Sequence, residues 1–176
     1  MSGMNRRELL LTLTGAAALA TQVPLQLTAA EPGKPLYFTR DEFTTLDTLT
    51  ELIVPTDVHS PGAKAAGVAA YIDKSVAEAF LSEEKESWRK GLALVNQLSH
   101  SMNGKPFNSA TPQQQVAVLT VMAKNEKDPK TPAEKFFTQL KQTTASTYYS
   151  SSIGIHKEMN YKGNVLLQQF VGYDAT

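Results

Sequence analysis

The spacing of the apolar residues is the feature that most limits the fold of this chain. In several stretches they recur every three or four residues, the period of one face of an α-helix, and no stretch of strand length alternates apolar with polar residues. The first such stretch follows Thr39, which forms a capping-box pattern with Glu42, and it stops at Pro55. Its buried face is predicted to hold Phe43, Leu46, Leu49, Leu52 and Ile53. The pattern favours an all-α protein.

Four further segments repeat this spacing, over residues 68–80, 82–102, 112–123 and 132–149. Thr111 is the predicted cap of the third of these segments. The side chains predicted to face inward are Ile72, Val76, Phe80, Trp88, Leu92, Val95, Leu98, Met102, Val116, Leu119, Met122 or Ala123, Phe136, Phe137, Leu140 and Thr144. Together the segments predict one compact bundle of about five helices.

The length of 176 residues suits a single domain. We expect residues 31–38, which are rich in proline and glycine, to be a linker, and residues 39–176 to form the helical domain. The last part of that domain, residues 150–176, reads as an irregular tail with one short helix over residues 165–170.

Residues 1–30 have the composition of an export signal. Arg6 and Arg7 precede the uncharged, mostly apolar stretch Leu9–Ala20, and small residues follow at Thr28–Ala30. This order predicts a cleavable signal peptide, and the adjacent arginines indicate its twin-arginine variant. An uncleaved anchor or a structural helix is the alternative, but Pro24 helps to interrupt the apolar run before it is long enough to span a membrane. The predicted destination is the periplasm.

Composition excludes several classes of site. The chain has no cysteine, which rules out disulfides, cysteine-ligated zinc, iron–sulfur clusters and covalently attached haem c. Lys and Arg together number 17, as do Asp and Glu, so the formal net charge is zero. Without a basic excess there is no electrostatic support for binding nucleic acid.

No pattern of catalytic residues stands out. The three histidines, His59, His100 and His156, lie far apart in the sequence, and none has a partner at a metal-ligand spacing. There is no G-x-S-x-G elbow and no G-x-G-x-x-G loop for a flavin or nicotinamide nucleotide. The acidic residues of the first helix, among them Glu51, are interpreted as a solvated face. An enzyme that uses His59 or His156 with a carboxylate is kept as an alternative.

Two regions are candidates for contact with a partner protein. The first is the loop after Pro55, in which Pro61 and Gly62 demand a fixed path and Asp57 is expected to bond its own backbone. It is either a connector that positions the second helix or a loop docked on a partner.

The second candidate region contains Phe137, Tyr148, Tyr149 and Tyr161. Phe136 and Phe137 are adjacent and cannot both face one stripe of a helix, so one of them is available for a second surface. Tyrosines near the end of a helix are of the type that is enriched at interfaces. Ordinary core and surface tyrosines are the alternative.

These regions also carry a family resemblance. The chain resembles the small subunit, called subunit 3 or gamma, of bacterial flavin-dependent gluconate 2-dehydrogenase. The matching pieces occur in order at Arg6-Arg7, Leu52–Asp57, Pro61–Ala63, Ala66–Val68, Tyr71–Asp73, Gly104, Phe107, Phe136–Lys141, Tyr148–Ser150 and Tyr161–Asn164. None of these pieces is a catalytic signature, and the resemblance rests on their order.

The resemblance implies a non-catalytic accessory subunit that holds no cofactor. In that family the large subunit binds FAD and oxidises a sugar or sugar acid, and a c-type cytochrome carries the electrons onward. The small subunit binds the large one and is thought to take it through the twin-arginine translocase. A stand-alone periplasmic binding or scaffold domain with a different partner is the alternative. Relatives often have a cysteine near the final glycine, and its absence here excludes a covalent tie to a partner.

Overall fold

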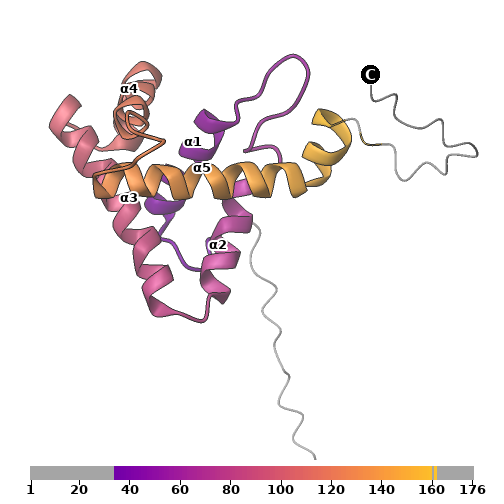
Figure 1. The fold of residues 1–176 in the computed structure, drawn as a ribbon, viewed down its shortest axis with the longest axis horizontal. Coiled ribbons are helices and arrows are strands. Elements are labelled where there is room, and N and C mark those ends of the chain that lie inside the picture. The colour runs from indigo at the N-terminus through magenta and orange to yellow at the C-terminus, as the bar shows by residue number, and fades with distance from the viewer. Residues whose placement is uncertain (1–33, 160, 162–176) are drawn as a thin grey trace, which may run out of the picture. The chain divides into compact units, whose positions relative to one another are not determined.

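The computed structural model describes residues 34–159 and 161. Within these residues the fold is entirely helical, with five α-helices and two short helical turns and without a β-strand. In chain order the elements are α1 (Arg40–Ile53), α2 (Val68–Glu78), α3 (Ser82–Asn103), η1 (Phe107–Ser109), α4 (Pro112–Met122), α5 (Pro132–Ser150) and η2 (Gly154–Glu158) (Figure 1). The all-α prediction is confirmed. The predicted signal peptide, Arg6, Arg7 and the predicted helix over 165–170 lie outside the described residues.

Local sequence signals determine where several helices begin and end. Thr39, Thr111 and Thr131 each accept a hydrogen bond from the third residue of the following helix, and the side chain of that residue bonds back to the threonine. These reciprocal capping boxes satisfy backbone donors that a helix start leaves open. At the other end of α3, Gly104 has a φ of 70°, a left-handed conformation that glycine adopts without a side-chain clash.

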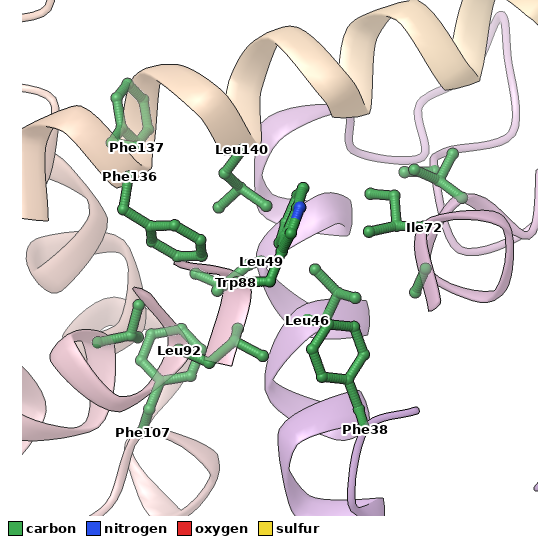
Figure 2. Close-up of a cluster of buried hydrophobic side chains, with 14 of the residues drawn as sticks. Phe38, Leu46, Leu49, Ile72, Trp88, Leu92, Phe107, Phe136, Phe137 and Leu140 are labelled. Carbon is green, nitrogen blue, oxygen red and sulfur yellow. The ribbon is translucent and has the colours of Figure 1, made fainter. Parts of the chain in front are cut away.

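Helix α5 lies across the other four helices and contacts all of them (Figure 1). Figure 2 shows Phe136 and Leu140 of α5 directed toward the cluster that contains Trp88 and Leu92 of α3 and Leu49 of α1. The rings of Trp88 and Phe136 meet edge to face with centroids 5.7 Å apart, a favoured aromatic geometry. The core is therefore built around α5.

Three residues that were predicted to face inward are exposed. Phe80 is 97% exposed because α2 ends at Glu78, so Phe80 does not continue the helical stripe. Met102, near the end of α3, is also exposed. In α4 Met122 is buried as predicted, but Val116 is exposed and Val118 is buried instead. Apolar residues occur on several sides of α4, so their spacing alone does not identify the buried side.

Both adjacent phenylalanines of α5 are buried, as the helical spacing predicted, and neither serves the second surface that was also considered. Figure 2 shows Phe136 and Phe137 leaving α5 in different directions. Successive residues on a helix differ by about 100° in direction, and α5 contacts α4 as well as α3. Neighbouring helices therefore cover both rings, and Phe137 lies within the core.

Candidate functional site

The loop between α1 and α2 is held together by a carboxylate at the end of α1. Oε1 of Glu51 accepts hydrogen bonds from the backbone N and the hydroxyl of Thr56, each at 2.9 Å. Oε2 accepts one from the backbone N of Lys64 at 2.8 Å. Glu51 thus joins the beginning of the loop to its end, and the interpretation of Glu51 as part of a merely solvated face was wrong.

These contacts also set the ionisation of Glu51. Burial raises the pKa of its carboxyl group, but the hydrogen bonds from Lys64 and Thr56, with the nearby Lys64 charge, together outweigh that effect and lower the pKa below 4.5. The folded loop therefore favours the charged carboxylate. A shift in this direction links the stability of the loop to pH.

Close packing around Gly62 leaves no room for a side chain at this position of the loop. The backbone N of Gly62 donates to the Thr56 hydroxyl at 2.9 Å. A Cβ atom at Gly62 would lie 2.5 Å from both the backbone N of Thr56 and Oε1 of Glu51. A side chain at this position would have to displace backbone as well as the carboxylate. The predicted fixed path of the loop is explained by this contact.

The tip of the loop is formed by an aspartate turn, as the sequence predicted. Oδ1 of Asp57 accepts hydrogen bonds from the backbone N of His59 at 2.7 Å and of Ser60 at 2.8 Å. The bonds from Ser60 and His59 lower the pKa of the Asp57 carboxyl group. The turn leaves Val58 with 92% of its surface exposed. An apolar side chain is thus presented to solvent on an ordered loop.

Tyr148 fastens the loop to α5. Its hydroxyl donates to the carbonyl of Pro61 at 2.7 Å and lies 2.7 Å from the hydroxyl of Ser60. The Tyr148 side chain is only 1% exposed. The structure therefore places this candidate interface residue inside the chain, where it positions the loop.

The residues that follow Tyr148 return to the surface. The ring of Tyr149 meets that of Tyr148 edge to face at 5.4 Å and is exposed. Beyond α5, the turn η2 is followed by Met159 and Tyr161, which are also exposed. Figure 1 shows the α1–α2 loop and η2 both at the C-terminal half of α5. We give the name loop–tail surface to a set of exposed side chains from the loop, the end of α5 and the residues after η2: Pro55, Asp57, Val58, His59, Tyr149, Met159 and Tyr161.

The structure divides the predicted interface residues into two groups. Pro55, Asp57, Tyr149 and Tyr161 are exposed, whereas Pro61 is half-buried and three are buried, namely Gly62, Phe137 and Tyr148. Sequence reasoning missed Val58 and Met159. Lone apolar residues in loops are common, so no pattern distinguished these two.

All three histidines lie at the surface of the protein, and His59 is close enough to Asp57 to interact with its charge. His59, His100 and His156 are exposed and lie on separate segments. Within residues 34–159 and 161, no three His, Cys, Asp or Glu side chains form a group that could hold a metal ion. A shallow groove of about 370 Å³ between α3 and α5 is lined by residues such as Lys90, Gly91 and Phe136. The rest of its lining is largely polar and includes Glu83, Glu86 and Ser87.

None of the helices among the described residues has both the length and the apolar composition needed to cross a membrane.

Comparison with known proteins gave a family match. No curated protein and no solved structure matches the chain. The family model described as gluconate 2-dehydrogenase subunit 3 matches residues 40–165, which begin at the first residue of α1 and include all the helices described above. This match covers well over half of the sequence, and the chain belongs to the gluconate 2-dehydrogenase subunit 3 family.

Proposed function

We propose that this chain is a non-catalytic small subunit of an FAD-dependent dehydrogenase complex that oxidises a sugar or sugar acid in the periplasm. Its role is to bind the flavoprotein large subunit, to stabilise it and to direct its export through the twin-arginine translocase. Family membership supports the assignment to a dehydrogenase complex. FAD would be held by the large subunit, and haem c by a cytochrome subunit that receives the electrons.

The observation that carries this proposal is the loop–tail surface. Glu51, Gly62, Asp57 and Tyr148 fix the loop in place, yet its tip exposes Val58 almost completely. An apolar side chain in water gains by burial in a partner. A loop that is already ordered also loses less conformational entropy on binding. Both properties suit a docking surface.

The partner contact is tested by co-purification from the native host. We expect the tagged chain to retain a large subunit whose absorption spectrum shows flavin bands. Val58→Asp places a charge in the proposed contact and should lower recovery of the partner about tenfold, which corresponds to about 1.4 kcal/mol. Val116→Asp is the matched control, because Val116 is an exposed valine on α4, away from the loop.

Equal recovery with both variants would contradict the assignment of the loop–tail surface. A wild-type chain that is isolated alone and colourless would contradict the dehydrogenase complex itself. Capture of a stoichiometric partner without flavin would favour the second candidate, a scaffold domain for a different protein.

The export role depends on Arg6 and Arg7, which the twin-arginine machinery would read. Changing both to lysine keeps the charge but removes the planar guanidinium groups. We expect the fraction of the large subunit found in the periplasm to fall severalfold in this double variant, as measured by fractionation and immunoblotting. The Arg40→Lys change in α1 is the control. Normal export of the partner in the double variant would refute the carrier role.

A pH dependence follows from the lowered pKa of Glu51. Its stabilising effect is fully present above the unfolded-state pKa near 4.5 and is lost as the pH falls through the lower folded-state value. Glu51→Gln should therefore reduce the free energy of unfolding by about 1 kcal/mol at pH 7, after allowance for solvent screening. The deficit should shrink toward pH 3.

Urea unfolding at several pH values measures the effect, with Glu78→Gln as the control because Glu78 is exposed on α2. A deficit that stays constant from pH 7 to pH 3 would show that the charge of Glu51 is not what holds the loop.

A further inference from the structure

The segment that leads into α1 is bound by a buried carboxylate. Residues 36–38, which we call the entry strap, present three consecutive backbone N–H groups to Asp73 of α2. The N of Leu36 donates to Oδ2 at 2.5 Å, and the N atoms of Tyr37 and Phe38 donate to Oδ1 at 3.0 Å each. The contact joins segments that are 35 to 37 residues apart in the sequence.

Asp73 and the side chain of Phe38 are buried, so their contact can form only when the surrounding helices have packed. Asp73 is 3% exposed, and the side chain of Phe38 belongs to the hydrophobic core. A buried carboxylate is costly unless hydrogen bonds compensate it. Here the three donors all come from the strap, so an open strap would remove all three hydrogen bonds from the Asp73 carboxylate. Docking of the strap and burial of Asp73 are therefore coupled.

A cation on α3 secures the strap. Nη2 of Arg89 donates to the carbonyl of Tyr37 at 3.2 Å, and the guanidinium carbon lies 4.5 Å from the centre of the Tyr37 ring. Nε of the same side chain pairs with Glu42 of α1 at 3.2 Å. The strap thus contacts residues that are correctly placed only when α1, α2 and α3 have packed together.

We propose that Asp73 is a folding-dependent latch. It fixes the backbone of residues 36–38 once the first three helices have assembled. The Leu36 side chain is exposed, so it is the bonded backbone of the strap that the latch protects from proteases. Proteases therefore cut within the strap of the folded protein only when the latch opens. This inference concerns only the chain itself and does not depend on a partner or on export.

The latch is tested by proteolysis of the purified full chain under native conditions. Thermolysin cleaves before large apolar residues, and mass spectrometry quantifies the product that begins at Phe38. When opening is fast, the cleavage rate follows the population of the open form. We expect Asp73→Asn, which replaces an acceptor oxygen with an amide donor, to raise the rate of cleavage at Tyr37–Phe38 at least tenfold. Asp47→Asn is the control, because Asp47 pairs only with exposed Lys64 at 2.9 Å in the described contacts.

An unchanged rate in Asp73→Asn would overturn the latch. Amide hydrogen exchange of the wild-type chain gives an independent test if that variant does not fold. The latch requires the amides of Leu36, Tyr37 and Phe38 to be as protected as that of Leu140 in the core. Exchange of the strap amides at least tenfold faster than that of Leu140 would refute the proposal.

Discussion

Replacing Gly91 with alanine is expected to lower the free energy of unfolding by about 3 kcal/mol. Gly91 lies in α3 and is buried against α5. A Cβ atom at this position would lie 2.1 Å from Cδ2 of Phe136, and the ring is held in turn by its edge-to-face contact with Trp88. Overpacking of a close-packed core costs about 1–3 kcal/mol, and a clash this close belongs at the upper end.

A loss of stability at this position is informative because alanine has a higher helix propensity than glycine, so propensity alone would predict a gain. In an exposed helix interior, Gly→Ala stabilises by about 1 kcal/mol. Thermal unfolding of the Gly91→Ala variant should show a midpoint about 6–12 °C lower. The double variant Gly91→Ala with Phe136→Leu should recover part of the loss, because leucine leaves room for the new methyl group. A midpoint that is unchanged or raised in the single variant would contradict the packing seen between α3 and α5.

Replacing Gly62 with alanine is expected to lower the free energy of unfolding by about 2–3 kcal/mol. The added Cβ would meet the backbone N of Thr56 and the Glu51 carboxylate, each at 2.5 Å. Relief of these contacts requires the loop to move and the Glu51 hydrogen bonds to break. The Tyr148 contact to Pro61, the residue before Gly62, should loosen as well. The expected result is both a less stable protein and a displaced loop tip.

Comparison with Val58→Asp separates these two effects. Val58 is almost fully exposed, so its substitution should weaken partner recovery with little change in the unfolding midpoint. Gly62→Ala should lower both the unfolding midpoint and the recovery of the partner. The loss of recovery should be seen even at a temperature at which circular dichroism shows the variant to be folded. If Gly62→Ala lowers the midpoint but leaves partner recovery intact, the loop tip is not part of the docking surface. Gly104→Ala is a control for glycine replacement, because it strains a positive φ without a nearby clash.

The sequence was sufficient for those features of the fold that depend on neighbours in the chain. The capping box at Thr39 and the aspartate turn at Asp57 were predicted because each uses donors within three residues. The family resemblance was likewise confirmed by the match over residues 40–165. In contrast, the buried side of α4 was assigned to Val116 instead of Val118, because only packing against other helices decides between them.

The parts of the site that escaped prediction depend on contacts distant in the sequence. Asp73 receives its hydrogen bonds from residues more than 30 positions earlier, and Tyr148 bonds residues 87 and 88 positions earlier. Neither Asp73 nor Tyr148 lies in a local sequence pattern that predicts these hydrogen bonds. Tyr148 was therefore proposed as a surface residue, whereas the tertiary fold gives its hydroxyl an internal acceptor.

Glu51 and Asp73 act as cross-links in a chain that has no cysteine. Glu51 bonds the backbone of Lys64, 13 residues later, and Asp73 bonds that of Leu36, 37 residues earlier. Each carboxylate thus closes a segment of the chain by hydrogen bonds instead of a covalent bond. A disulfide in these positions would have to await an oxidising environment. The carboxylate cross-links need no oxidant and are insensitive to a reductant, so this domain can complete its fold in a reducing compartment and keep it unchanged in an oxidising one.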